Sequence, residues 1–507
     1  MDHHIAGRLD EADLIYRQVL VDHPSHPDAL HLLGIIQSQR GQPHLAIDLI
    51  SRAVKVRPDV AWFHMHLAEN LRALRKYDDA LAASRRAVEL APNDAMVHNS
   101  LGACLSDMRQ FDPAIAEFRR AIELKPDLAD AHSNLGAALV ATGQLEEAVV
   151  SLQTALQLNP YLPGAHNNLG NALYNLGNIS EAIASFERVA AAHPNDAKIH
   201  ANLALAFLLL GDFQRGWREH EWRLKVPEIV GNRQFTQPRW NGESLDGKTI
   251  LLHAEQGFGD AIQFARFIPR VAAMGGTVIL ESPPELFRLF QKFPGVSQLA
   301  TRGQSLPRFD LHCPLNSLGF VFNINAQTIP SADSYLQSDP DLVREWAGRF
   351  DANDRRKRIG LVWAGRPQHT NERNRSMRLE QFAPLAHLNS IAFYSLQKGD
   401  AAVQAAHALD GLHLIDWTND LRDFADTAAM IAHLDLVISV DTAVAHLAGA
   451  MGKPVWLLLP WISDWRWMRD RPDSPWYRSM RLFRQSKIGD WAGVLQTVRD
   501  SLQNEFT

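Results

Sequence analysis

The sequence predicts an α-helical solenoid followed by an α/β region with two parallel sheets. Proline recurs every 34 residues in the first part, at Pro24, Pro58, Pro92, Pro126, Pro160 and Pro194. Alanine keeps the same period at positions 12, 46, 80, 114, 148 and 182. From Thr249 onward short apolar runs alternate with helical segments instead. A fixed period of this length indicates a repeated structural unit, so the chain combines a repeat array with a second architecture.

Each 34-residue unit has the pattern of a helical hairpin, with small residues where two helices touch and proline after the second helix. Glycine follows two series, Gly34, Gly102, Gly136 and Gly170, then Gly7, Gly41, Gly143, Gly177 and Gly211. The segment AHSNLGAALVATGQLEEAVVSLQTALQLNP, residues 131–160, resembles the tetratricopeptide repeat, and this resemblance covers residues 1–225. A solenoid of such repeats has a concave face that is normally used to hold a peptide or protein. The first 20 residues have the pattern of a second helix whose first helix is missing.

Composition narrows the classes of function. The net charge of −6 argues against general affinity for nucleic acid or anionic membrane. Cys104 and Cys313, one in each half, exclude a disulfide framework and a thiolate metal cluster. There is neither a secretory leader pattern nor an apolar run of about 18 residues. We therefore expect a cytoplasmic protein without a transmembrane segment.

After the repeats, residues 226–248 form a polar, turn-rich linker. Strand and helix patterns then alternate in two blocks, residues 249–345 and 355–507. This alternation predicts two Rossmann-like domains that face a cleft. Ligands of open α/β sheets bind beyond the carboxyl ends of the strands, and three polar segments lie at such ends.

The first of these segments is HAEQGFGDAIQFARF, in which Gly257 and Gly259 let the backbone turn tightly and Asp260 begins a helix. A helix-starting aspartate is often only a cap. The second is WAGRPQHTNERNRS, whose arginines either lie in solvent or clamp a phosphate. The third is SVDTAVAHLAGAMGKPVW, in which Asp441 and Thr442 open a helix directly after an apolar strand. Free N–H groups and the helix dipole make that start a natural diphosphate site.

Together these three motifs resemble the family 9 glycosyltransferases, to which the heptosyltransferases belong, over about residues 249–485. The resemblance implies a GT-B fold that needs no metal, with the acceptor side on the first domain, residues 249–345. The nucleotide-sugar donor would be held mostly by the second domain, residues 355–507. It also implies that Asp260 is the general base for the acceptor hydroxyl. The implied donor and phosphate site consists of Gly257, Gly259, Arg366, Arg373, Arg375, Asp441, Thr442, Ala443, Val444 and His446. Arg373 and Arg375 match the basic residue of the phosphate loop equally well.

The acceptor is less defined, because the first α/β block is short and not notably basic. Repeats joined to a GT-B region also resemble, in architecture, the O-linked N-acetylglucosamine transferases, in which asparagines on the concave face hold the peptide backbone. Asn134, Asn168 and Asn202 occupy such positions at 34-residue spacing, whereas Ser100 and His66 replace them earlier. The acceptor is therefore expected to be a protein or a glycan on the concave face.

Four features also have structural interpretations. His64, His98, His132, His166 and His200 recur with the repeat, and helices about 8–10 Å apart favour packing over a metal array. Asp339 precedes Pro340 as a helix cap does. The Trp- and Arg-rich segment 461–485 is compatible with a stacking surface or with a packed lid, and His446 with core packing or with ligand contact.

Two functions remain at this level. The first is an inverting, metal-independent glycosyltransferase whose repeats select the acceptor. The second is a repeat scaffold that binds proteins and carries a degenerate GT-B module.

Overall fold

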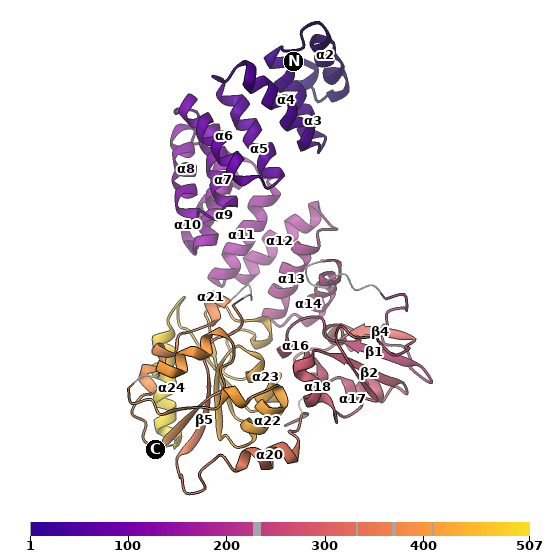
Figure 1. Cartoon of the computed structure of the whole chain (residues 1–507), viewed down its shortest axis with the longest axis vertical. Helices are drawn as coiled ribbons and strands as arrows, with labels where there is room; N and C mark the ends of the chain where they lie inside the picture. Colours follow the sequence, from indigo (N-terminus) through magenta and orange to yellow (C-terminus); the bar gives the residue numbers. More distant parts are fainter. Residues whose placement is uncertain (1, 227–234, 331–332, 368–371, 408–409, 507) are drawn as a thin grey trace. The chain divides into compact units, whose positions relative to one another are not determined.

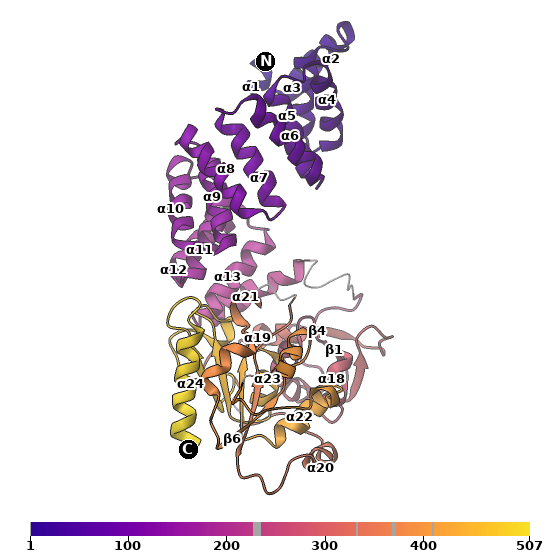
Figure 2. The ribbon, with the colours of Figure 1, turned by 60° about the vertical axis from the view of Figure 1, so that its left-hand side comes forward.

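The computed structural model describes residues 2–506 except 227–234, 331–332, 368–371 and 408–409. The chain separates into two compact units, Met1–Pro194 and Asn195–Thr507. The described residues of the first unit form helical hairpins (Figures 1 and 2). The second contains the last hairpin and both parallel sheets. Part of the linker predicted at 226–248 lies outside the described residues.

The helices of the first unit follow the predicted period. They are α1 (Asp2–Ile5), α2 (Leu9–Asp22), α3 (Pro27–Gln39), α4 (Pro43–Val56), α5 (Ala61–Ala73), α6 (Tyr77–Leu90), α7 (Ala95–Asp107), α8 (Phe111–Leu124), α9 (Ala129–Thr142), α10 (Leu145–Leu158), α11 (Pro163–Leu176) and α12 (Ile179–Ala192). Consecutive helices from α3 to α12 pack in pairs, and within this unit each pair also contacts the next. This is the predicted solenoid.

Small residues are required where the two helices of a hairpin meet. A Cβ atom added to Gly34 would lie 2.6 Å from Ile50, and one added to Gly136 would lie 2.4 Å from Leu152. The partner lies 16 residues further along in each case. The alanines at positions 46, 80, 114, 148 and 182 are fully buried. The periodic glycines of the first series therefore serve close helix packing.

The periodic histidines bond to the periodic prolines. The Nε2–H groups of His64, His98, His132 and His166 donate to the carbonyl oxygens of Pro58, Pro92, Pro126 and Pro160 at 3.0, 2.9, 2.9 and 3.1 Å. Each bond ties the first helix of a repeat to the turn that precedes it. These histidines are a structural element of the repeat, as expected from their spacing.

The second unit opens with α13 (Ala197–Leu209), α14 (Phe213–His220) and the 3₁₀ helix η1 (Glu221–Lys225). The first sheet has the order β3-β2-β1-β4, with all strands parallel. Its elements are β1 (Thr249–His253), α16 (Phe258–Ala265), α17 (Ile268–Ala272), β2 (Thr277–Ser282), α18 (Pro284–Phe290), β3 (Gln298–Thr301), β4 (Leu311–Pro314), η2 (Leu315–Ser317) and α19 (Leu318–Val321). Helix α20 (Pro340–Ala347) leads to the second sheet.

The second sheet has the order β10-β9-β8-β5-β6-β7, again with all strands parallel. Its elements are β5 (Lys357–Val362), α21 (Glu372–Arg375), η3 (Leu379–Leu385), β6 (Ile391–Ser395), η4 (Asp400–His407), β7 (Leu414–Asp416), η5 (Thr418–Asp420), α22 (Phe424–Ala432), β8 (Leu436–Val440), α23 (Ala443–Ala450), β9 (Val455–Leu459), η6 (Trp465–Trp467), β10 (Met480–Arg484) and α24 (Trp491–Phe506). Counted from β5, this is the doubly wound nucleotide-binding order. The predicted α/β architecture is present in both sheets.

Two local features of the structure were not predicted. The segment 260–274 has a helical pattern in the sequence, and it forms two helices, α16 and α17, with a break at Arg266 and Phe267. Pro269 explains the break, because it lacks the N–H that would continue the hydrogen bonds of α16. The strands β3, β4 and β10 were not predicted, since the first two are only four residues long and the third lies inside the Trp-rich segment.

Candidate functional site

The three polar segments follow β1, β5 and β8. In each sheet the strand order reverses beside the first strand, between β1 and β4 and between β5 and β8. A crevice opens at such a reversal, beyond the carboxyl ends of the strands. The segments predicted to carry chemistry therefore lie where an open α/β sheet binds its ligands.

Helices α16 and α23 join the two domains, because they pack against each other. A Cβ atom added to Gly259 on α16 would lie 2.8 Å from Cδ2 of His446 on α23. Gly257 has φ of −73°, which other residues adopt readily. We expected both glycines to permit a tight turn, and this explanation was wrong. Gly259 is needed instead for close contact between the domains.

Asp260 lies in the first turn of α16 with both carboxylate oxygens engaged. The N–H of Gly257 donates to Oδ2 at 2.8 Å, which caps the helix. The other oxygen, Oδ1, accepts from Nη2 of Arg466 in an ion pair across the domains. The side chain is 18% exposed, so it is not sealed from solvent. Asp260 is thus a helix cap that also faces the second domain.

Arg466 is the charged centre of the site, and sequence reasoning did not single it out. Its guanidinium also pairs with Asp464, through Nη1 at 2.9 Å, and donates to the side-chain oxygen of Gln263 on α16. It lies 4.4 Å from the ring centroid of Trp465 and is 7% exposed. Arginine and aspartate within an otherwise tryptophan-rich run were the available signal. We refer to Asp260, Asp441, His446, Asp464 and Arg466 as the aspartate–arginine cluster.

Asp441, at the carboxyl end of β8, has an unusual environment. Burial raises its pKa from 3.8 to about 6, and the nearby carboxylate of Asp464 adds to the effect, whereas Trp467 and Arg375 oppose it. Its Oδ1 atom lies 3.9 Å from Nε2 of His446. A carboxyl group with a pKa near 6 can change its protonation when a charged ligand binds.

The start of α23 has no side-chain cap. Thr442 precedes the helix, but its hydroxyl bonds to the hydroxyl of Ser439 at 3.0 Å and does not cap the helix. Ala443 and Val444 form the first turn and are half-buried. Their side chains are small or apolar, so this turn can offer a ligand only backbone groups and the helix dipole.

His446 lies one turn further and is buried. Its Nδ1 atom is 2.8 Å from the hydroxyl of Tyr477. Burial, with Arg466 and Arg266 nearby, holds its pKa well below the ordinary value, so the ring is neutral at pH 7. This environment favours the packing interpretation over direct contact with a ligand.

The three arginines of the second segment have different environments. Arg375 is 13% exposed, pairs with Glu372 at 3.0 Å and donates from Nη1 to the carbonyl oxygen of Asp441 at 2.9 Å. Arg373 is exposed. The Arg366 guanidinium lies 4.1 Å from the ring centroid of Phe258 at the start of α16. Arg375 therefore joins the site directly. Residues 368–371 of this segment lie outside the described residues.

The Trp-rich segment is largely core. Trp465, Trp467 and Trp476 are each at most 2% exposed. Trp465 and Trp476 contact each other with ring centroids 5.9 Å apart. For these three side chains the structure favours the packed interpretation over an open stacking surface.

The repeat asparagines and Asp339 are not part of the cluster around Arg466. Asn134 donates from Nδ2 to Oδ1 of Asn99 in the preceding repeat at 2.9 Å. Asn168 and Asn202 are half-buried. Asp339 accepts from the N–H of Asp341 at 2.9 Å and caps α20, as expected. At least the first asparagine thus has a bond between helices.

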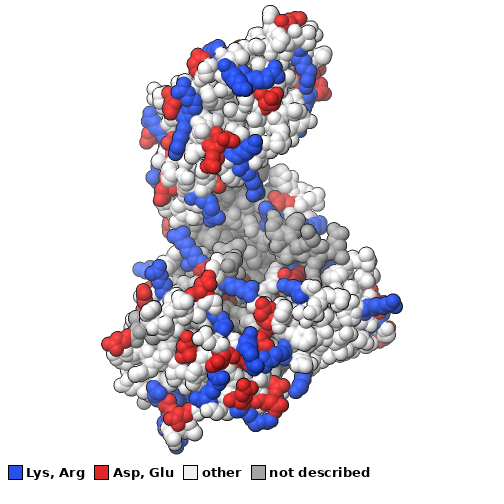
Figure 3. Space-filling view, in the orientation of Figure 1, with Lys and Arg blue, Asp and Glu red and all other residues white. Residues whose placement is uncertain are grey.

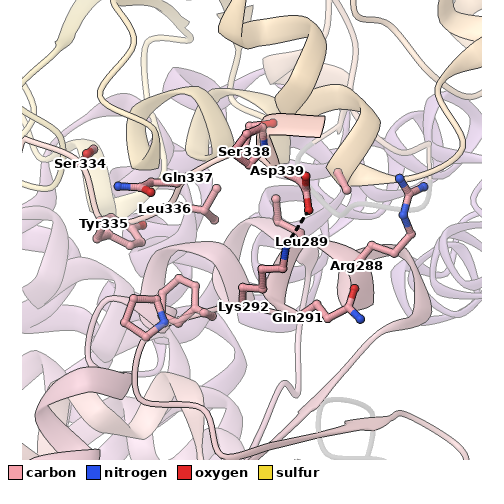
Figure 4. Close-up of a pocket in the computed structure, with 14 residues that line it drawn as sticks. Arg288, Leu289, Gln291, Lys292, Ser334, Tyr335, Leu336, Gln337, Ser338 and Asp339 are labelled. Atoms are coloured by element: carbon pink, nitrogen blue, oxygen red, sulfur yellow. Dashed lines mark hydrogen bonds and ion pairs between the residues drawn. The ribbon is translucent and has the colours of Figure 1, made fainter. Parts of the chain in front are cut away.

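A pocket of about 350 Å³ lies between α18, the segment 334–340 and Ala425 at the start of α22 (Figure 4). Lys292 and Asp339 point toward each other there, with Nζ and Oδ2 3.2 Å apart. Arg288 pairs with Asp423, the N-cap residue of α22, at 3.2 Å. None of the predicted site residues lines this pocket.

On the face shown in Figure 3, basic and acidic residues are interspersed over the repeats. Within the described ranges, no helix has both the length and the apolar composition needed to cross a membrane. In that same part of the chain, no three His, Cys, Asp or Glu side chains are grouped to hold a metal ion.

The repeats and the α/β region match models of different protein families. Models of the tetratricopeptide repeat match residues 31–95, 109–143, 138–177 and 167–216. The model of glycosyltransferase family 9 (heptosyltransferase) matches residues 399–458, which include Asp441 to Val444 and His446.

Protein FlbA of Caulobacter vibrioides is 28% identical over 319 residues, which cover 58% of this chain and 53% of FlbA. This chain therefore spans about half the length of FlbA. Among solved structures, the APC/C hetero-tetramer Cut9–Hcn1 matches with a TM-score of 0.42 and 18% identity over 46% of this chain and 45% of that chain. The structure of Pseudomonas aeruginosa PilF matches with a TM-score of 0.35 and 20% identity over 41% and 93% of the two chains.

Proposed function

We propose, from the tetratricopeptide repeats and the family 9 glycosyltransferase match that this chain carries, that it transfers a sugar from a nucleotide-sugar donor to a protein or glycan acceptor selected by the repeats. The observation that carries the proposal is the convergence of Asp260 and Asp441, about 180 residues apart in the chain, on Arg466. The two residues come from the domains that would hold acceptor and donor in a GT-B enzyme.

The donor diphosphate would lie at the start of α23. Backbone N–H groups of Ala443 and Val444 and the guanidinium of Arg375 supply positive charge there. These groups support leaving-group stabilisation without a metal ion. Protonated Asp441 could donate a hydrogen bond to the donor, whereas ionised Asp441 would repel the diphosphate.

Asp260 would deprotonate the acceptor hydroxyl. Direct attack of that hydroxyl on the anomeric carbon breaks the bond to the diphosphate and inverts the configuration. The carboxylate would first have to loosen its ion pair with Arg466, which would then lie beside the developing charge.

The test of donor binding uses the two arginines that the sequence could not distinguish. Nucleoside diphosphates should bind the full chain in the presence of a chelator, as measured by calorimetry. Arg375→Ala should weaken that binding roughly 10- to 100-fold, the cost of a charge-assisted hydrogen bond. The matched control Arg373→Ala should leave the affinity nearly unchanged, because Arg373 is exposed. Equal effects of the two variants would contradict the donor site.

A second arm of the experiment addresses turnover. Asp260→Asn should keep donor affinity and lose about 10²- to 10⁴-fold in transfer rate, since the amide can cap Gly257 but cannot accept the acceptor's proton.

The alternative function is a protein-binding scaffold with a degenerate GT-B module. It is favoured by one observation, namely that both oxygens of Asp260 already have structural partners. Transfer at the parent rate by the Asp260→Asn variant would show that Asp260 is not the general base. Absence of both nucleotide binding and transfer in the parent chain would establish the scaffold.

A further inference from the structure

The last hairpin of the repeats is built into the α/β unit. Trp217 of α14 is 1% exposed, and its indole N–H donates to the carbonyl oxygen of Ile324 at 2.7 Å. Its ring contacts Phe264 of α16 and Trp465 of η6, with centroids 6.2 and 5.3 Å apart. The two elements that carry Asp260 and Arg466 therefore share one aromatic contact on this hairpin.

The 3₁₀ turn after α14 also reaches the loop that leads to Asp260. Arg223 of η1 is 2% exposed, and its Nε donates to Oε1 of Glu255 at 2.9 Å. Its other nitrogens donate to Oγ of Ser317 at 2.8 Å and to Oε1 of Glu221 at 2.8 Å. Glu255 lies in the β1–α16 loop, two residues before Gly257. A side chain of the repeat region thus holds the loop from which α16 starts.

This ion pair is sealed from water. The Glu255 side chain is 4% exposed, and burial raises its pKa, although Arg223 opposes the effect. Oε2 of Glu255 has no hydrogen-bond partner among the residues that the structure describes. Removing the guanidinium would leave an uncompensated buried carboxylate, which is strongly destabilising locally. The loop would then have to move so that Glu255 could reach water.

We infer that Arg223 is a positioning residue for the proposed transfer reaction, because it fixes the β1–α16 loop and so the place of Asp260. The last repeat hairpin is on this view a part of the catalytic framework and not only a binding module. The inference rests on the proposed function for its effect on turnover. Its effect on the loop does not depend on that function.

The test compares Arg223→Met with Arg218→Met, an exposed arginine on the same hairpin. Hydrogen exchange of the full chain should show lost protection at residues 254–260 in Arg223→Met, with β1 still protected. In the transfer assay, kcat should fall at least about tenfold while the affinity for nucleoside diphosphate changes less than about twofold, because a misplaced base affects only the chemical step. Arg218→Met should match the parent in both readouts.

A rescue variant separates positioning from general damage. Arg223→Met combined with Glu255→Leu replaces both charges by apolar side chains, which removes the buried lone carboxylate. It should restore protection of the loop and most of kcat. Unchanged exchange and kcat in folded Arg223→Met would overturn the inference. A parent chain without transfer activity would overturn the proposed function instead, and the exchange result would still decide the role of Arg223.

Discussion

At the residue scale the site depends on carboxylates whose properties are set by burial and by one arginine. Arg466 pairs with Asp260 and Asp464 and lies near Asp441, so three acidic groups share one buried cation. One positive charge cannot fully compensate three carboxylates. Burial is the main cause of the raised pKa of Asp441, and the nearby carboxylate of Asp464 adds to it.

The stability of the chain should therefore depend on pH through Asp441. Its pKa is about 6 in the folded chain and 3.8 as the ordinary value, so the folded state binds more protons between these values. Stability from this group is full below pH 3.8 and is lost as pH rises through 6, by at most about 3 kcal/mol. Asp441→Asn lacks this loss, so it should be more stable than the parent at about pH 7 and gain little at about pH 4.

The measurement is denaturant unfolding of both proteins at the two pH values. The depressed pKa of His446 acts in the opposite direction, with stability lost as pH falls, but it is common to both proteins and largely cancels in the difference. The same difference in unfolding free energy at both pH values would show that the carboxyl group of Asp441 is not perturbed.

At the element scale the turn inside each hairpin needs a left-handed residue. Gly41, Gly143 and Gly177 have φ of 72°, 83° and 94° there. Arg75 and Arg109 occupy the equivalent positions with φ of 57° and 59°. This conformation is unfavourable for a residue with a Cβ atom, so the backbone of these two turns is strained.

Arg109→Gly should therefore stabilise the repeats by about 0.5–1 kcal/mol, the strain relieved less the extra entropy of glycine in the unfolded chain. Thermal unfolding of the full chain measures this gain. The reverse change at an equivalent turn, Gly143→Arg, should reduce the free energy of unfolding by a comparable amount and so lower the melting temperature. A loss of stability in Arg109→Gly would show that contacts of the arginine outweigh the strain.

At the scale of the whole molecule, the 34-residue period predicted the solenoid because each repeat contacts only its neighbours, so local pattern and tertiary structure coincide. Gly34 and Ala46 could be assigned to helix contacts for this reason. The site was predicted only where motifs follow strands. Arg466 and Arg223 were missed because their decisive contacts, with Asp260 and Glu255, join residues about 200 and 30 positions apart, and the local sequence does not indicate which distant residue each arginine meets.

The asparagine series combines a bond between repeats with groups that can bind an acceptor. Asn134 uses one N–H to bond Asn99, which leaves its Oδ1 atom and second N–H hydrogen for a peptide backbone. A structural role and a binding role therefore predict different effects for the two ends of that bond.

Replacement of Asn134, Asn168 and Asn202 by alanine should reduce the recovery of partner proteins on the immobilised chain and leave nucleoside diphosphate affinity unchanged. The matched control is Asn99→Ala, which breaks the Asn134–Asn99 bond at a cost of about 1 kcal/mol but keeps Asn134 itself. If the asparagines bind the acceptor, the control should lose stability and still recover the partners. Equal loss of partners in both proteins would mean that the bond between helices, and not the asparagine series, accounts for the effect.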